Sequence, residues 1–194
     1  MTRFVCAAIA SVLLVGCSSE PATQAETAAE AQAAPSSDAE IIARAITAAP
    51  ADLAANAAVV EPNMDTMEMR EVRPGTNGWV CMAHPEVMCL DAQWQEWADA
   101  WMNKRAPNIT GLGIGYMLQG DVGASNVDPY ATEATPDNQW VTSPAHLMIV
   151  TPNAVELDTL PTDPYNGGPW VMWKGTPLAH VMVPIVPMPA RPAN

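Results

Sequence analysis

The chain has 194 residues, of which 49% are hydrophobic and only 15% are charged, and its formal net charge at pH 7 is −13. A chain this acidic lacks the electrostatic footprint for phosphate backbones, so we expect no nucleic-acid partner. It should also be repelled by anionic lipid surfaces. The low charge density and high apolar content predict a packed domain rather than a disordered chain.

The first 17 residues have the pattern of an export signal. Arg3 gives a positive start, and residues 4–15 form an apolar run of about 12 residues, the length of a signal-peptide core and too short to cross a bilayer. The run ends in Leu14-Val15-Gly16-Cys17, which resembles the lipobox of bacterial lipoproteins. In a lipobox the signal is cut before the cysteine, and that cysteine is acylated. We therefore predict a signal peptide at residues 1–16 and lipidation (palmitate) at Cys17; an ordinary cleaved signal or a buried N-terminal helix is the alternative.

The residues after Cys17 predict how the protein is held and where. Ser18 follows the cysteine. By resemblance to Gram-negative sorting patterns, a residue other than Asp at this position indicates the outer membrane, so we expect an outer-membrane anchor facing the periplasm. After Cys17, the stretch to residue 38 is rich in Ala and has no Leu, Ile, Val or aromatic residue, which predicts that residues 17–38 are a flexible tether. Residues 39–194 form one globular domain by length. No later stretch has 18 consecutive apolar residues, so no transmembrane helix is expected.

The domain opens with two predicted helices and two predicted strands. Residues 38–49 have helical apolar spacing with Asp38 as N-cap, and residues 51–58 are a candidate second helix. Residues 67–72 and 79–82 read as strands. The intervening RPGTNG contains Pro-Gly and Asn-Gly pairs, so these strands are predicted to form a hairpin.

A tryptophan-rich helix over residues 91–104 is the clearest predicted element. Asp91 is its N-cap, and a stripe of large rings recurs along one face at Trp94, Trp97 and Trp101. The following residues 111–120 alternate glycine with larger side chains, which predicts a strand with one bare face. We expect the tryptophan stripe to lie on that face.

The rest of the chain predicts a polar loop, three strands and an extended tail. Residues 121–138 are the loop, the strands cover 146–150, 170–173 and 180–185, and a proline-rich tail follows. The predicted fold class is α+β, with a small antiparallel sheet packed by one Trp-rich amphipathic helix and many Pro/Gly turns.

Cys81 and Cys89 are the only cysteines of the domain. In an exported protein such a pair is usually a disulfide, and closing a loop of about nine residues stabilises the fold by roughly 2.5 kcal/mol. A redox-active pair usually has the C-x-x-C spacing, which is absent here.

Two His-x-Met pairs suggest a soft-metal site. In a strand, residues two apart face the same way, so His146 with Met148, and His180 with Met182, could each face one ion. Two imidazoles and two thioethers suit Cu(I) if the strands are neighbours. The alternative is core packing, because methionine fills irregular interiors and both segments are strongly apolar. On that interpretation no cofactor is expected.

The remaining patterns are weaker indications of a calcium site, a catalytic site or a ligand-binding rim. Loop oxygens at Asp121, Ser125, Asn126 and Asp128 hint at calcium, but Asn126 stands where an EF-hand needs glycine. No catalytic motif is present, so no catalytic residue is assigned, although two loop carboxylates could still meet as an enzyme site. The aromatic rings outside the helix, at Trp140, Trp170 and Trp173, are predicted to be core, with a ligand-binding rim as the alternative.

Residues 75–186 resemble a family of bacterial secreted or lipid-anchored proteins that has no established activity. The resemblance lies in TNGWVCM, MCLDAQW, EWADAWMNK, GYMLQGDVGASNVDPYAT, LPTDPYNGGPWVMWKGTP and AHVMVP. It implies no functional residue. The sequence as a whole predicts a cell-envelope lipoprotein with a non-enzymatic binding or structural role, held on the membrane by its lipid. The alternatives are a periplasmic copper-binding protein and an enzyme with an acidic-loop site.

Overall fold

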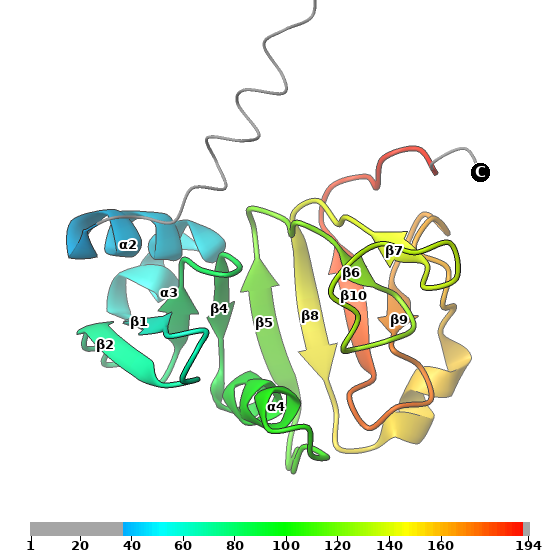
Figure 1. The fold of residues 1–194 in the computed structure, drawn as a ribbon, viewed down its shortest axis with the longest axis horizontal. Coiled ribbons are helices and arrows are strands. Elements are labelled where there is room, and N and C mark those ends of the chain that lie inside the picture. Colours follow the sequence, from blue (N-terminus) through cyan, green and yellow to red (C-terminus); the bar gives the residue numbers. More distant parts are fainter. Residues whose placement is uncertain (1–36, 192–194) are drawn as a thin grey trace, which may run out of the picture. The chain divides into compact units, whose positions relative to one another are not determined.

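In the computed structural model the chain divides into two units, residues 1–33 and 34–194, and the structure describes residues 37–191 (Figure 1). The predicted signal peptide, Cys17 and nearly all of the tether lie outside the described residues. Within 37–191, no helix has both the length and the apolar character needed to cross a bilayer.

The described domain is α+β, as predicted. Its helices are α2 (Asp38–Ala45), α3 (Ala51–Asn56) and α4 (Ala92–Met102), with 3₁₀ turns η1 (Ile46–Ala48) and η2 (Ala154–Thr159). Its strands are β1 (Ala58–Pro62), β2 (Met69–Arg73), β3 (Val80–Met82), β4 (Met88–Leu90), β5 (Gly113–Met117), β6 (Ala124–Ser125), β7 (Trp140–Val141), β8 (His146–Val150), β9 (Trp170–Met172) and β10 (His180–Pro184).

The main sheet is larger than the sequence predicts. It has eight strands in the order β2-β1-β3-β4-β5-β8-β10-β9, and β6 pairs with β7 in a separate ribbon. All neighbours are antiparallel except β1 and β3, which are parallel. The prediction of a small sheet under a single helix is not confirmed, because short three-residue strands join the ladder and α2 and α3 also pack on the sheet.

The predicted hairpin between residues 67–72 and 79–82 is wrong. Strand β1 lies between β2 and β3, pairing antiparallel with β2 and parallel with β3. The true hairpin is β1–β2, whose turn begins at Asn63: the side-chain oxygen of Asn63 accepts hydrogen bonds from two backbone N–H groups, those of Asp65 and Thr66. The RPGTNG segment instead crosses beside β1, with Gly75 so close that a Cβ would lie 2.1 Å from the backbone nitrogen of Ala58.

Helix α2 is capped one residue earlier than predicted. Ser37, not Asp38, is the N-cap, and its hydroxyl accepts a hydrogen bond from the Glu40 backbone N–H at 3.3 Å. Asp38 is instead the first helical residue and forms an ion pair with Arg70 on β2 at 2.8 Å. The sequence Ser-x-x-Glu is the usual capping pattern, which the prediction passed over in favour of the following acid.

Helix α4 lies on the glycine face of β5, as predicted. The Asp91 carboxylate caps the helix through the backbone N–H groups of Gln93 and Trp94, and its other oxygen accepts from the N–H of Ile114 on β5 at 2.6 Å. A Cβ on Gly113 would lie 2.6 Å from the Cβ of Gln93 on α4, so the helix can lie this close only where the strand has no side chain. The Trp94 indole N–H then donates to the carbonyl of Met148 on β8 at 3.1 Å.

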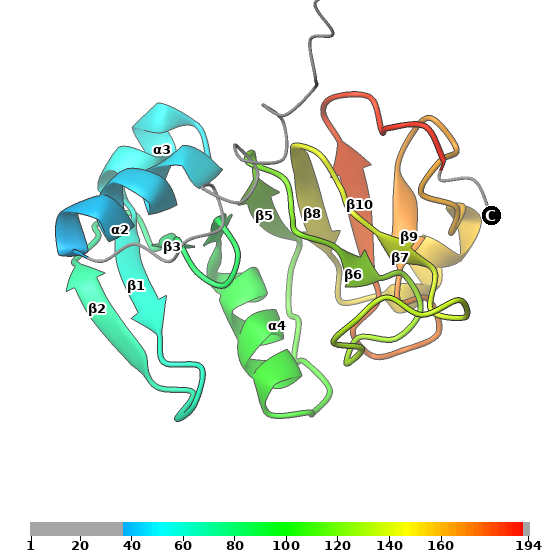
Figure 2. The ribbon, with the colours of Figure 1, turned by 45° about the horizontal axis from the view of Figure 1, so that its top comes forward.

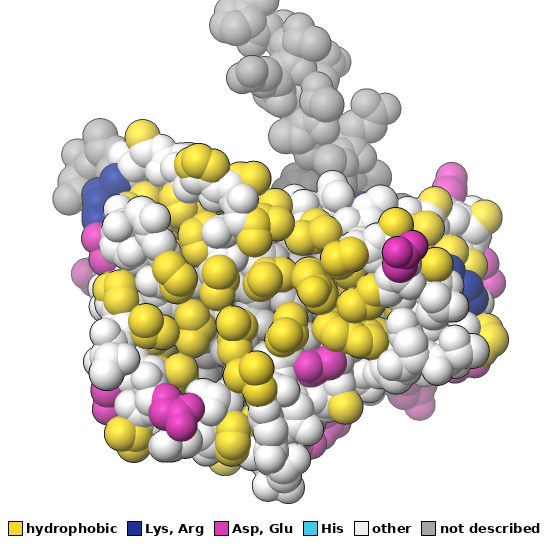
Figure 3. All heavy atoms as spheres, turned by 180° about the vertical axis from the view of Figure 1, so that it is seen from behind, with side chains coloured by type: hydrophobic (Ala, Val, Ile, Leu, Met, Phe, Trp, Pro, Cys, Tyr) yellow, Lys and Arg dark blue, Asp and Glu magenta, His cyan; other side chains and the backbone are white. Residues whose placement is uncertain are grey.

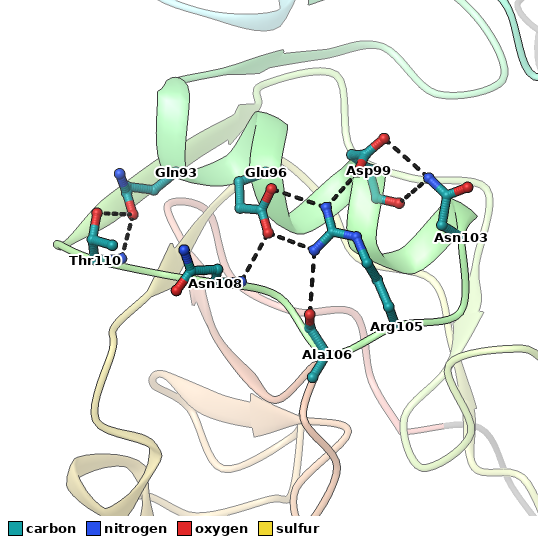
Figure 4. A network of polar contacts seen from close by, with 8 residues as sticks. All are labelled: Gln93, Glu96, Asp99, Asn103, Arg105, Ala106, Asn108 and Thr110. Atoms are coloured by element: carbon teal, nitrogen blue, oxygen red, sulfur yellow. Dashed lines mark hydrogen bonds and ion pairs between the residues drawn. The ribbon is translucent and has the colours of Figure 1, made fainter.

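An exposed ionic network holds the segment that follows α4 against the helix (Figure 4). Arg105 binds both oxygens of Glu96 at 2.6 and 2.9 Å and also contacts Asp99. Glu96 accepts the N–H of Asn108 at 2.8 Å, and the Arg105 hydrogen bonds lower the pKa of Glu96 to about 2. The segment is thereby directed back toward β5.

The sheet is covered differently on its two faces. On one face, α4 packs over Leu90, Gly115 and Met148, and the β6–β7 segment lies in front of the β10 and β9 end (Figure 2). On the other face, α2, η1 and α3 cover the β1–β3–β4 end, where they bury the two cysteines, and η2 covers the β9–β10 end. Among residues 37–191, no helix lies over the middle of this second face.

The tryptophans outside the helix mostly belong to the core, as predicted. Trp170 is fully buried and Trp173 is 8% exposed. Their indole N–H groups donate to the Asn126 side chain and the Ser125 carbonyl respectively, so they fasten the long loop to β9.

We predict that Gly113→Ala lowers the free energy of unfolding by about 1–3 kcal/mol, because a Cβ there would lie 2.6 Å from side-chain atoms of Gln93 and Val150. The matched control is Gly111→Ala on the same segment, where a Cβ meets nothing within 4 Å and stability should be unchanged or slightly raised. Urea unfolding monitored by tryptophan fluorescence measures both. Equal effects of the two substitutions would contradict the seating of α4 on a bare strand.

Candidate functional site

The two His-x-Met strands are neighbours in the sheet. β8 and β10 pair antiparallel, with Met148 directly opposite Met182 and His146 opposite Pro184. His180 precedes Val181, the first paired residue of β10, and so lies at the opposite end of the two strands from His146. All four predicted ligands therefore occupy the face under α4, and each is at least 93% buried.

The register separates the two imidazoles instead of bringing them together. His146 and His180 lie diagonally on either side of the methionine pair, about four residues apart along the strands, which corresponds to roughly 13 Å. Side chains stand nearly perpendicular to a sheet, so the two rings do not converge on one point. The thioethers of Met148 and Met182 alone face each other across the strands. A four-ligand copper centre stays a prediction, and this register does not favour it.

His180 lies inside an aromatic cluster. Its ring is perpendicular to three indole rings, those of Trp94, Trp97 and Trp173, at centroid distances of 5.1 to 5.2 Å. Its Nδ1 is hydrogen-bonded to the Leu178 carbonyl at 3.0 Å. Complete burial lowers its pKa to about 4, so the ring is neutral at physiological pH. In this environment His180 acts as a core residue.

His146 is part of a buried polar cluster at the end of β8. Its Nδ1 is 2.7 Å from the Pro144 carbonyl, and its Nε2 has no hydrogen-bond partner among the described residues. Asp121 lies close enough to interact with the imidazole, and its carboxylate accepts the Ser143 backbone N–H at 2.8 Å. Burial lowers the pKa of His146 and raises that of Asp121.

Glu86, in the loop closed by the two cysteines, extends this cluster toward the surface. Its carboxylate is 3.5 Å from the Val122 backbone N–H. Burial, and then the nearby charge of Asp121, raise the pKa of Glu86 to about 7. Sequence reasoning missed this residue because Glu86 and Asp121 are 35 positions apart, and no local pattern links them.

The cluster contains serine, histidine and aspartate, but they do not form a relay. The Ser143 hydroxyl and His146 Nε2 are both buried and both lack a hydrogen-bond partner within residues 37–191, so the two are not bonded to each other. Nucleophilic catalysis requires that bond and access for a substrate. In the same part of the chain, no group of three or more His, Cys, Asp or Glu residues is placed to hold a metal ion.

The acidic loop uses its oxygens internally. The Ser125 hydroxyl accepts two backbone N–H groups and donates to the Asn138 carbonyl, and the Asn126 side chain bonds to Trp170 and Thr162. The Asp128 carboxylate accepts the Tyr130 N–H. These contacts stabilise the loop and do not assemble the calcium ligand set that the sequence suggested.

The predicted disulfide is confirmed. Cys81 and Cys89 are opposite each other on β3 and β4, their sulfurs are bonded, and both residues are fully buried. Cys17, the predicted lipidation site, lies outside the described residues.

The uncovered middle of the sheet is the most extensive candidate binding surface. Two rows of apolar side chains cross β5, β8 and β10 there: Tyr116, Leu147 and Val183; Ile114, Ile149 and Val181. Val181 is buried beneath η2, and the other five side chains are half-buried. We call these rows, together with the exposed Leu112 and Ile185 beyond their ends, the apolar strip. Figure 3 shows hydrophobic side chains gathered across this face, with few charges among them.

Comparison of the chain with protein-family models, curated proteins and solved structures finds no match in any of the three. The family resemblance of residues 75–186 therefore stays a prediction, and the function is inferred from this chain alone.

We predict that Glu86→Gln stabilises the fold above pH 7 and not at pH 4.5. The ordinary pKa of the Glu86 carboxyl is 4.5 and its native pKa is about 7, so the native state binds more protons between these values. The stabilisation that this proton uptake gives the native state is fully present below pH 4.5 and is lost as the pH rises through 7. Glutamine keeps the neutral form at every pH.

Urea midpoints at pH 4.5, 6 and 8 test this against the exposed Glu133→Gln as control. The buried histidines change the free energy of unfolding with pH in the opposite direction, and they do so equally in the wild type and in both variants. Each variant is therefore compared with the wild type at the same pH. A midpoint difference that is the same at pH 4.5 and 8 would contradict the buried position of Glu86.

Proposed function

We propose that this chain is a lipid-anchored protein of the bacterial cell envelope whose domain has a non-enzymatic binding or structural role. The disulfide is the observation that carries the proposal. A buried Cys81–Cys89 bond is typical of exported proteins, because disulfides persist in oxidising compartments and are rare in the cytosol. It agrees with the export pattern that the sequence independently has at residues 1–17.

The lipid is the membrane attachment in this proposal. Several acyl chains on Cys17 would bind a bilayer far more firmly than one, since each buried methylene adds about 0.8 kcal/mol. The acidic domain would be repelled by anionic lipid headgroups, so the tether would keep it in the aqueous phase. We place the anchor in the outer membrane, facing the periplasm, because Ser18 follows the cysteine.

The apolar strip supports a binding role for the domain. Most of the buried polar side chains are hydrogen-bonded within the protein, and His146 itself is fully buried. The strip instead presents apolar side chains from three neighbouring strands, mostly half-buried along its middle and exposed at Leu112 and Ile185. Such exposed patches are typical of surfaces that contact other envelope components.

The anchor is tested by metabolic labelling with radioactive palmitate in a Gram-negative host. We expect label on the wild-type protein and none on Cys17→Ser. Cys6→Ser is the matched control, because this cysteine lies inside the predicted signal and its loss should leave labelling unchanged. Label retained in Cys17→Ser, or Met1 retained on the mature protein, would overturn the anchor.

The binding surface is tested by photo-crosslinking in intact cells. A photoreactive amino acid replaces Leu112 or Ile185 at the strip, and Val127 as an exposed apolar control on the long loop. We expect crosslinked adducts from the two strip positions and not from Val127. Adducts from Val127 alone, or from none of the three positions, would argue against the strip.

A further inference from the structure

The turn of the β1–β2 hairpin carries three exposed methionines. Met64, Met67 and Met69 are 45%, 41% and 43% exposed, and every other described methionine is buried or half-buried. Methionine is normally used to fill a core, so packing does not explain this group. The three belong to the six-residue segment Met-Asp-Thr-Met-Glu-Met.

Backbone hydrogen bonds bring the three residues close together. The Asn63 carbonyl accepts the Met67 N–H at 2.7 Å, which closes a single helical turn, and the Asn63 N–H donates to the Glu68 carbonyl at 2.8 Å. A turn of this kind brings Met64 and Met67 near each other, and Met69 begins β2 directly after it. The flexible thioether side chain has three rotatable bonds, so the sulfurs can meet over the turn.

Met67 has a backbone conformation that is unusual for its residue type. Its φ is 60°, in the left-handed region that side chains other than Gly, Asn or Asp rarely adopt. Residues held in such conformations cluster at ligand-binding sites. Lys104, Gln139 and Trp173 also have a positive φ, so this conformation distinguishes Met67 only together with its exposure and its two methionine neighbours.

The surroundings of the turn favour a cation. Asp65 and Glu68 lie within the segment, and Glu61 is on the adjacent end of β1. The nearby Arg70 is paired with Glu61 at 2.7 Å and with Asp38 at 2.8 Å, which leaves Asp65 and Glu68 as the acidic side chains of the turn itself. A surface hollow beside the hairpin is lined by Glu61, Pro62, Asn63, Glu68, Met69 and Arg70, so of the three methionines Met69 contributes to it.

We propose that Met64, Met67 and Met69 form a surface thioether site for a soft monovalent cation, with Cu(I) as the ligand. Thioether sulfur selects Cu(I) over hard divalent ions, and the neighbouring carboxylates add attraction without competing as soft ligands. This site differs from the buried Met148 and Met182 pair in being open to solvent. It goes beyond the envelope role proposed above and does not depend on the anchor.

The site is tested with Ag(I), a redox-inert stand-in for Cu(I), on the full chain carrying Cys6→Ser and Cys17→Ser to remove free thiols. With ¹³C-methyl methionine, NMR should show three methyl signals shifting and saturating at one equivalent of Ag(I). Met64→Leu, Met67→Leu and Met69→Leu together should abolish these shifts and the one-equivalent binding. These exposed, volume-conserving changes keep the fold, which an unchanged spectrum of the core methyls confirms.

The matched control is Met102→Leu with Met188→Leu, two half-buried methionines elsewhere, which should bind Ag(I) as the parent does. In competition against a chromogenic Cu(I) chelator, the parent and the control variant should withdraw Cu(I) from the chelator equally well, and the hairpin triple variant should not. The proposal is overturned if the hairpin triple variant binds like the parent, if the shifting signals are those of Met148 and Met182, or if no binding occurs at micromolar Ag(I).

Discussion

The seating of Trp94 on the bare face of β5 is the contact on which the rest of the domain depends. Because Gly113 has no side chain, α4 can approach β5 closely, and the Trp94 indole reaches the Met148 carbonyl on the neighbouring strand β8. The same ring contacts Trp97 and His180, so one close approach organises the aromatic core. The ionic network of Arg105 then directs the chain from the helix back into β5.

This arrangement is the reason that the register does not favour a shared metal site at the predicted ligands. The strands that hold His146 and His180 lie under the helix, and three tryptophan rings surround His180. The sequence pattern correctly indicated that the pairs share a face. It could not indicate that the antiparallel register spaces the two imidazoles along the strands, because register depends on pairing partners that are distant in sequence.

Signals that depend on a few neighbouring residues were mostly reliable in this sequence, although the α2 cap and the predicted hairpin were wrong. The α4 helix with its Asp91 cap, the alternating β5 strand and the Cys81–Cys89 disulfide were all predictable, since each depends on spacing within a few residues. The insertion of β1 between β2 and β3 was not, because the Pro-Gly and Asn-Gly signals at 74–78 fit a crossing segment as well as a hairpin. The polar cluster of Glu86 and Asp121 was missed for the same reason: tertiary structure alone brings them together.

Hydrogen exchange at the Trp94 indole N–H measures the central contact most directly. Its bond to the Met148 carbonyl is buried, so this proton should exchange only when the whole domain unfolds, at a rate set by the global free energy of unfolding. The indole of Trp101, which is half-buried at the edge of the same helix, should exchange by smaller local openings. Exchange at Trp94 as fast as at Trp101 would contradict the seating of α4 on β5.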